Sequence, residues 1–134
     1  MMSTQSYVKI LNEWDIVAAR QVGRNVAKEL GFGTVDQARI TTTISELARN
    51  IYLYAGQGEI GIEKLWDNGR TGLRVIAEDK GQGISDIRRV MEDGYTTSGG
   101  LGAGLPGVKR LMDEFEIDSE VGVGTKITTT KWIR

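Results

Sequence analysis

Hydrophobic residues along this chain follow two different spacings, and each change of spacing marks the boundary of a predicted element. At helical spacing, Val22, Val26 and Leu30 precede Gly31, and glycine commonly ends helices. Alternating apolar and polar positions, typical of half-buried strands, begin at Ile60. Together these patterns predict helices over 13–30, 34–55, 87–91 and 105–115, and strands over 7–11, 60–66, 73–79, 115–119 and 125–133.

Turn and capping residues support these boundaries. Asn12 is a typical helix-capping residue, and Thr34 with Gln37 fits a capping box. The segment Asp67-Asn68-Gly69 predicts a tight turn between two strands. We therefore expect an α+β fold, a two-layer sandwich in which a mostly antiparallel mixed sheet carries helices on one face. The length predicts a single domain spanning residues 1–134.

The amino-acid composition excludes several kinds of catalytic group. The chain has a formal net charge of −1 and contains neither cysteine nor histidine. It therefore cannot use a disulfide, a thiolate nucleophile, a histidine base or a histidine phosphoacceptor. The near-zero charge gives no reason to expect a nucleic-acid partner. A polar N-terminal segment, and the lack of an apolar run of roughly 20 residues, argue against a signal peptide or a membrane partner, so we expect a cytoplasmic protein.

One polar pair falls on the predicted second helix. Glu46 and Asn50 are four residues apart, so a helix places them on one side, one turn above the other. The Asn50 amide oxygen is a suitable ligand for Mg²⁺, and the Glu46 carboxylate can orient or deprotonate an attacking hydroxyl. The pair also fits the solvated polar stripe of an ordinary amphipathic helix.

An acid stands at the end of a predicted strand. Asp79 is followed by Gly81 and Gly83, whose conformational freedom allows a sharp turn and the close approach of a ligand. A carboxylate at this position can accept a hydrogen bond from an exocyclic amine such as that of adenine. The alternative interpretation is a simple turn at the end of the strand.

A glycine-rich segment, 99–107, precedes the last predicted helix. Residues 102–107 match the G-x-G-x-x-G pattern, but no apolar strand precedes them and too little chain follows for a dinucleotide-binding unit. A Gly-Lys-Ser/Thr motif is also absent from the sequence. What remains is a glycine loop leading into a helix N-terminus, which suits a phosphate group, or a loop that is merely flexible. Further on, the segment Gly122-Val123-Gly124-Thr125 predicts a turn into a strand. It can place the Thr125 hydroxyl beside a nucleobase, or it is an ordinary β-turn.

In this order and at this spacing, the segments resemble the motifs of the GHKL ATPase and kinase superfamily. Since the chain is short and has glutamate in its N box, it is similar to the stand-alone anti-sigma-factor serine kinases, and among them to the switch kinases of the bacterial stressosome. The resemblance covers essentially the whole chain. The residues that carry it form an N box, two glycine boxes and a final Gly-Thr element: Glu46 and Asn50; Asp79, Gly81 and Gly83; Gly100, Gly102, Gly104 and Leu105; Gly124 and Thr125.

This resemblance implies a protein serine/threonine kinase that depends on ATP and Mg²⁺. Glu46 is then the catalytic base for a serine or threonine hydroxyl, Asn50 holds Mg²⁺, and Asp79 recognises the adenine amino group with Thr125 nearby. The loop over 85–102 acts as a lid. The nucleotide-binding residues that the resemblance implies are Asn50, Asp79, Gly81, Gly83, Gly100, Gly102, Gly104, Leu105 and Thr125.

The resemblance also implies a succession of protein partners. The substrates are STAS-domain proteins of the stressosome, and the released kinase then binds and activates a PP2C-type phosphatase. Two alternatives are a binding module that uses ATP only as a structural ligand, which leaves Glu46 without a purpose, and a plain ATPase that transfers phosphate to water. Arg49 lies outside the general superfamily pattern, and its contact can be the γ-phosphate, a partner or solvent.

Overall fold

Five strands form one sheet in the order β1-β2-β3-β5-β4, and each neighbouring pair is antiparallel. The computed structural model describes residues 4–92 and 104–134. The strands are β1 (Thr4–Ile10), β2 (Gly58–Asp67), β3 (Arg70–Asp79), β4 (Glu114–Glu120) and β5 (Gly124–Trp132). The helices are α1 (Glu13–Leu30), α2 (Thr34–Asn50), the π-helix η1 (Ile51–Ala55), α3 (Ile87–Val90) and α4 (Gly104–Leu111).

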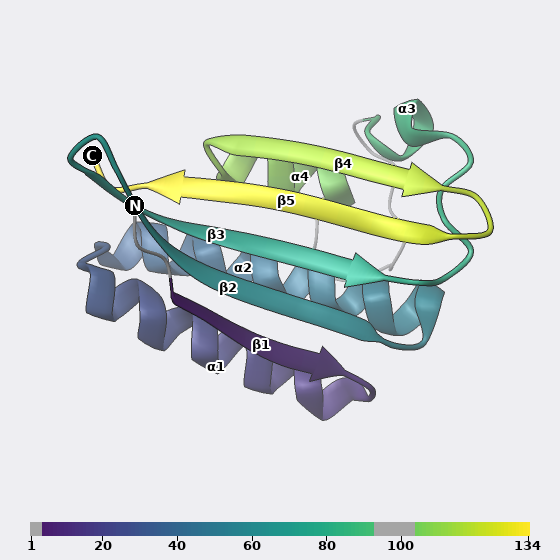
Figure 1. The fold of residues 1–134 in the computed structure, drawn as a ribbon, viewed down its shortest axis with the longest axis horizontal. Coiled ribbons are helices and arrows are strands. Elements are labelled where there is room, and N and C mark those ends of the chain that lie inside the picture. The colour runs from purple at the N-terminus through teal and green to yellow at the C-terminus, as the bar shows by residue number, and fades with distance from the viewer. Residues whose placement is uncertain (1–3, 93–103) are drawn as a thin grey trace.

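The helices cover one face of the sheet. Figure 1 shows the sheet in front and α1, α2 and α4 behind it. Ile60 and Ile62 of β2 and Val75 of β3 are buried in one core with Ile40 and Ile44 of α2. Burying each such side chain contributes about 1.5–3 kcal/mol, so this core is the main force that holds the two layers together. The predicted two-layer α+β sandwich is confirmed, but the sheet of the described residues is entirely antiparallel and not mixed.

The two predicted helix starts have different outcomes. Asn12 caps α1 in a reciprocal capping box, in which the Asp15 N–H donates to its side chain and its own N–H donates to the Asp15 carboxylate. The capping box predicted at Thr34 is wrong, because α2 begins one residue earlier than such a box requires. Gly33 is the N-cap, and the Gln37 amide instead donates to the Phe32 carbonyl oxygen at 2.8 Å.

The connection between β2 and β3 fixes where the sheet ends. Asn68 and Gly69 both have positive φ angles, 51° and 79°, as the predicted two-residue turn requires. This turn lies at one end of the hairpin, and Asp79 is the last residue of β3 at the other end. Because β5 lies next to β3, Asp79 pairs with Thr125 across the two strands. Two residues 46 positions apart thus become neighbours.

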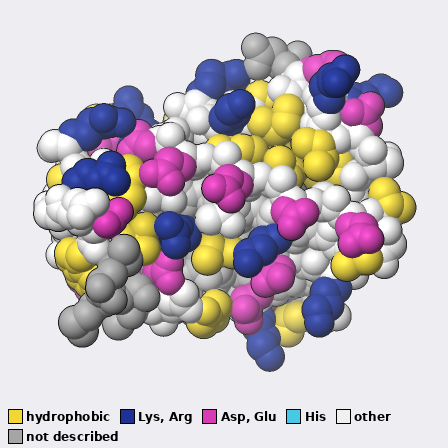
Figure 2. All heavy atoms as spheres, turned by 45° about the horizontal axis from the view of Figure 1, so that its top comes forward, with side chains coloured by type: hydrophobic (Ala, Val, Ile, Leu, Met, Phe, Trp, Pro, Cys, Tyr) yellow, Lys and Arg dark blue, Asp and Glu magenta, His cyan; other side chains and the backbone are white. Residues whose placement is uncertain are grey.

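The sheet face opposite the helices carries polar contacts between neighbouring strands. Arg74 Nη1 lies 3.0 Å from Glu63 Oε1, and Arg74 Nε lies 3.5 Å from Thr130 Oγ1 on the next strand. On the molecular face shown in Figure 2, Lys/Arg and Asp/Glu side chains are interspersed, so neither sign of charge dominates it. Within residues 4–92 and 104–134, no helix is long and apolar enough to cross a membrane.

Candidate active site

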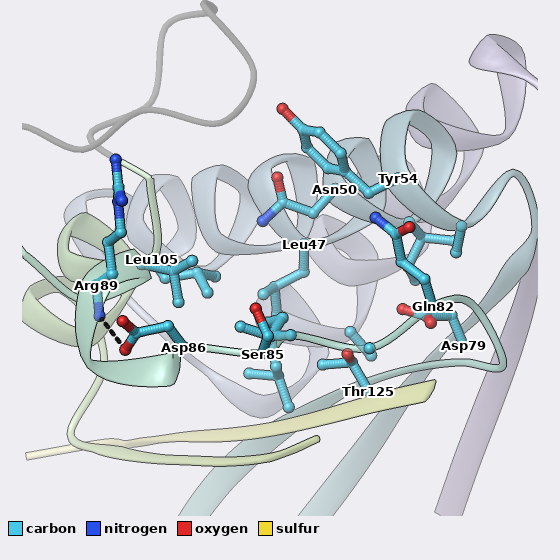
Figure 3. A pocket seen from close by; sticks show the side chains of 17 residues that line it. Leu47, Asn50, Tyr54, Asp79, Gln82, Ser85, Asp86, Arg89, Leu105 and Thr125 are labelled. Carbon is cyan, nitrogen blue, oxygen red and sulfur yellow. Dashed lines mark hydrogen bonds between the residues drawn. The ribbon is translucent and has the colours of Figure 1, made fainter. Parts of the chain in front are cut away.

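A cavity of about 600 Å³ lies where β3 ends and β5 begins. Its wall comes from α2 and η1 on one side and from the ends of β3 and β5 on the other, with the loop after β3, α3 and the start of α4 completing it. In Figure 3, Asn50 and Tyr54 come from the helical side and Asp79 and Thr125 from the strand side. The volume is in the range of cavities that hold small-molecule ligands and cofactors.

The Asp79 carboxylate is held by its own turn. Its Oδ1 accepts a hydrogen bond from the Gly81 N–H at 2.8 Å, and the carboxylate lines the cavity. Thr125, its neighbour on β5, has its Oγ1 2.8 Å from Ser119 Oγ on β4. The same Ser119 oxygen accepts from the Ile84 N–H at 2.8 Å. Strand ends and loop are therefore joined by hydrogen bonds that fix an acid and a hydroxyl on one wall.

Two glycines allow the backbones of the strand ends and of the loop to approach each other closely. Gly124 has a φ of 146°, and a Cβ there would lie 2.1 Å from the Asp79 carbonyl oxygen. Gly83 has a φ of 77°, and a Cβ there would lie 2.3 Å from the carbonyl oxygen of Glu120. Both contacts are with backbone atoms, which cannot turn aside as a flexible side chain does. The predicted glycine turn thus has a physical reason that is independent of any ligand.

The helical wall changes geometry at Asn50. This residue ends α2, and the following five residues form one turn of π-helix, closed by the Gly56 N–H donating to the Ile51 carbonyl oxygen at 2.9 Å. Single π-helical turns occur frequently at functional sites. Here the turn joins Asn50 and Tyr54, both of which line the cavity. The sequence predicted one continuous helix over this region, so the π-helix was not foreseen.

Glu46 lies one turn before Asn50 but is not part of the cavity wall. The residue is only 4 % exposed, its Oε1 lies 3.5 Å from Arg49 Nη1, and its Oε2 has no hydrogen-bond partner among the described residues. Burial raises the pKa of Glu46 above its ordinary value, and the nearby Arg49 guanidinium partly opposes that rise. A buried carboxylate with a raised pKa and a free oxygen is the kind of group that serves as a general base.

The glycine loop is described only in part. Gly104 begins α4 and is buried, and Leu105, the next residue, lines the cavity. Gly100 and Gly102 lie outside the described residues, as do residues 93–102 of the expected lid, so these assignments stay predictions. Gly81, which the sequence also indicated, contributes its N–H to the Asp79 turn.

Several residues of the wall were missed from the sequence. Tyr54 stands four residues after Asn50, the same spacing that singled out Glu46, and Gln82 stands between Gly81 and Gly83. The spacing of Tyr54 and the position of Gln82 between two glycines are the sequence features that indicate these two residues. Ser85 also lines the cavity, and no pattern in the sequence marks it.

Residues 35–133 match the family described as histidine kinase-, DNA gyrase B- and HSP90-like ATPases. The match covers most of the chain, and the fold and the cavity agree with it. The chain belongs to this family of ATP-binding proteins.

Among its relatives is the serine/threonine-protein kinase RsbT of Bacillus subtilis, which is 74 % identical over 133 residues, 99 % of this chain and 100 % of that protein. An anti-sigma F factor of Caldanaerobacter subterraneus is 34 % identical over 122 residues, 86 % of this chain and 83 % of that protein. With these relatives, the chain is a serine/threonine-protein kinase of the partner-switching class, and it binds ATP.

Solved structures support the fold. The crystal structure of the RsbU and RsbW domains of a Mycobacterium tuberculosis protein matches with a TM-score of 0.66 at 20 % identity, covering 100 % of this chain and 34 % of that one. A mycobacterial sensor histidine kinase, MprB, matches with a TM-score of 0.57 at 16 % identity, covering 96 % and 97 % of the two chains. At these identities the likeness concerns the fold alone.

Proposed function

We propose that this kinase transfers the γ-phosphoryl group of ATP, with Mg²⁺, to a serine or threonine of a STAS-domain stressosome protein in the cytoplasm. Once released, it binds and activates a PP2C-type phosphatase. One observation carries the proposal: Asn50, Asp79 and Thr125, from three separate segments, meet around one cavity, with Glu46 one helical turn before Asn50.

Adenine fits the strand side of the cavity. Apolar side chains line the cavity, among them Leu47 from α2 and Ala77 and Ile127 from the strands, and they suit the faces of a purine ring. Asp79 Oδ1 is engaged by the Gly81 N–H, which leaves the other carboxylate oxygen for the exocyclic amine of adenine. Thr125 Oγ1, anchored on Ser119, supplies a polar atom beside the ring.

Mg²⁺ fits at Asn50. Among the described residues, no cluster of three or more acidic side chains could form a metal cage. A single amide oxygen suits Mg²⁺, which keeps several waters and takes its remaining ligands from phosphate oxygens. When bound, the ion neutralises charge on the transferring phosphoryl group. The phosphates themselves are proposed to lie toward the N-terminal end of α4, near Gly104 and Leu105, with Gly100 and Gly102 completing the loop.

Glu46 is proposed as the base. The acceptor hydroxyl gives its proton to the Glu46 carboxylate, and its oxygen forms a bond to the γ-phosphorus. The bond from that phosphorus to the β,γ-bridging oxygen breaks, and its electron pair leaves with ADP. The proton then passes from Glu46 to solvent. Since Glu46 is covered in this structure, its cover must move before an acceptor can reach it.

Protein partners fit an exposed apolar surface at the start of α1. Leu11, Trp14 and Val17 are 56 %, 80 % and 53 % exposed. An exposed tryptophan with apolar neighbours is typical of a protein-binding surface, because aromatic anchors dominate the binding energy of interfaces. This observation supports the exchange of protein partners in the proposal.

A transfer assay tests the catalytic part. We expect labelled phosphate to move from γ-labelled ATP with Mg²⁺ to a serine or threonine of a purified STAS-domain protein. Omitting Mg²⁺ should abolish the transfer. ATP binding without any transfer would contradict the proposal and favour a binding module, whereas release of phosphate to water alone would favour a plain ATPase.

A competition assay tests the exchange of partners. An interface of standard size takes roughly 800 Å² from each partner, a sizeable fraction of the surface of so small a domain. We therefore expect the STAS-domain protein and the phosphatase to displace each other from the kinase in a pull-down. A stable ternary complex would contradict the exchange and leave the kinase activity unaffected.

A further inference from the structure

The proposed reaction leaves one contact unexplained, the ion pair between Arg49 and Glu46. Arg49 Nη1 lies 3.5 Å from Glu46 Oε1, three residues earlier on α2. Oε2 of the same carboxylate is buried and has no hydrogen-bond partner in the part of the chain that the structure describes. The two oxygens of one carboxylate therefore differ, because one faces a cation and the other is unengaged.

We infer that Arg49 is a positioning residue for phosphoryl transfer: it holds Glu46 by Oε1 and so leaves Oε2 for the acceptor hydroxyl. This inference rests on the proposed role of Glu46 as the base. A glutamate side chain has several rotamers, and a cation on one oxygen restricts them. The restriction matters because a general base works only within hydrogen-bond reach of the proton that it removes.

Thr43 is a second buried polar residue of α2 whose side chain lacks a hydrogen-bond partner among the described residues. Elsewhere on α2, the Thr41 and Ser45 hydroxyls donate to backbone carbonyl oxygens at 3.1 and 3.0 Å. The Thr43 hydroxyl is fully buried and has no partner among residues 4–92 and 104–134. Thr43 and Glu46 are three residues apart and therefore neighbours on the helix surface. Two residues three positions apart on α2 thus each carry a buried polar atom without a partner among the described residues. Such atoms call for a polar group from outside α2, and an acceptor hydroxyl is one such group.

The position of both residues on one helix matters for the reaction. Glu46 is covered, so its surroundings must rearrange before the acceptor approaches. If the cation were on another helix or strand, its ion pair with Glu46 would break when the two elements moved apart. Arg49 moves with α2, so the ion pair survives such a displacement. The Arg49 side chain is 30 % exposed, so it reaches the buried carboxylate and still retains contact with solvent.

Single-turnover transfer from labelled ATP to the acceptor protein tests the inference. Arg49→Gln should lower the rate roughly 10- to 100-fold, the usual effect of a misplaced catalytic group. ATP affinity and acceptor affinity should change little. Rates are compared at a temperature where every variant is folded, because Arg49→Gln leaves the buried Glu46 carboxylate without its cation. Arg49→Lys keeps the cation and should restore most of the rate. The matched control is Arg39→Gln, which removes the other Arg–acid pair at this spacing on α2, with Asp36 at 2.9 Å, and should leave the rate within about twofold.

The double variant Glu46→Gln with Arg49→Gln shows whether Arg49 acts through Glu46. With glutamine at position 46 there is no carboxylate to hold, so Arg49→Gln should cause no further loss. A further loss, or weaker ATP or acceptor binding in Arg49→Gln alone, would overturn the inference, because Arg49 would then contact the nucleotide or the partner. A wild-type rate in Arg49→Gln together with a slow Glu46→Gln would overturn it and leave the base assignment standing. A wild-type rate in Glu46→Gln would overturn both the role of Arg49 and the assignment of Glu46 as the base.

Discussion

The carboxylates of Asp113 and Glu46 are both largely buried, yet the fold treats them in opposite ways. Asp113 accepts hydrogen bonds from the Trp132 N–H at 2.8 Å and from Arg134 at 2.7 Å, and Lys131 Nζ lies 3.5 Å away. Glu46 has one cation at 3.5 Å and an oxygen with no hydrogen-bond partner among the described residues. The two side chains are 13 % and 5 % exposed, so burial alone does not separate them.

The difference in partners appears in the pKa values. Burial by itself raises the pKa of Asp113, but the Trp132 N–H, Arg134 and Lys131 together outweigh burial and leave the pKa below its ordinary value. For Glu46, burial outweighs the nearby Arg49 and the pKa is raised. A buried acid with all its partners serves the fold, here by joining the end of β5 to the start of β4. A buried acid with a partner missing is available for chemistry.

The largest expected effect is on catalysis at Glu46. Glu46→Gln preserves size and removes the proposed base, so the transfer rate should fall by about 10²–10⁴-fold. ATP affinity should stay nearly unchanged, because Glu46 does not line the cavity. Rates come from single-turnover assays and affinities from calorimetry. If the variant transfers phosphate at a near wild-type rate, Glu46 is only a buried polar residue and the comparison with Asp113 fails.

The next effect is on stability at Asp113. Asp113→Ala leaves the buried Lys131 ammonium and the Trp132 N–H without this acceptor, so the free energy of unfolding should fall by about 2–3 kcal/mol. The transfer rate per folded molecule should not change. Urea denaturation measures the loss, and Asp118→Ala on the exposed side of β4 is the control. Equal effects of the two variants would mean that the Asp113 hydrogen bonds contribute little.

A third acid, Asp79, extends the comparison to ligand binding. In the proposed site, Asp79→Asn replaces the acceptor oxygen for the adenine amine with a donor. This change should cost about 1–3 kcal/mol, or roughly ten- to hundredfold in ATP affinity. Calorimetry with ATP and with GTP measures this change. Unchanged ATP affinity, with GTP binding equally well to the wild-type protein, would remove the assignment of Asp79 to adenine.

The smallest effect is in pH dependence, where the two buried acids should show opposite signs. The raised pKa of Glu46 means that ionisation, as pH rises above the ordinary value of 4.5, opposes folding. The stability of Glu46→Gln relative to wild type should therefore increase as pH rises through this range. The lowered pKa of Asp113 means that its contribution is present above 3.8 and is lost as pH falls through its folded-state pKa.

The penalty of Asp113→Ala should accordingly shrink at the acidic end. Urea midpoints between about pH 3 and pH 7 measure both trends, within the pH range where each variant remains two-state. Parallel trends for the two acids would contradict the comparison, because they would mean that the two carboxylates have similar environments.

The sequence predicted the elements well and the burial of individual groups less well. Asn50, Asp79 and Thr125 were found because their motifs fall in a recognisable order, and the structure places all three on one cavity. The register that makes Asp79 and Thr125 neighbours depends on β5 lying between β3 and β4, which no local pattern encodes.

Local sequence patterns could not predict the burial of Glu46 or the residue at which α2 begins, and the reasons differ. The burial of Glu46 depends on what packs against α2, so periodicity showed only a polar position on a helix. The capping box expected at Thr34 failed because a Ser/Thr-x-x-Glu/Gln pattern does not say which residue begins the helix, and here the N-cap is Gly33.

The insertion of β5 between β3 and β4 has a consequence for how the protein is made. During synthesis, the Asp79 end of β3 emerges long before Thr125 and Ile127, which share the cavity wall with it. The edge strand β4 also has no partner in the sheet until β5 pairs with it. The wall of the cavity therefore stays incomplete until β5 has left the ribosome. The two strand-side walls of the cavity come together only when β5 pairs with β3.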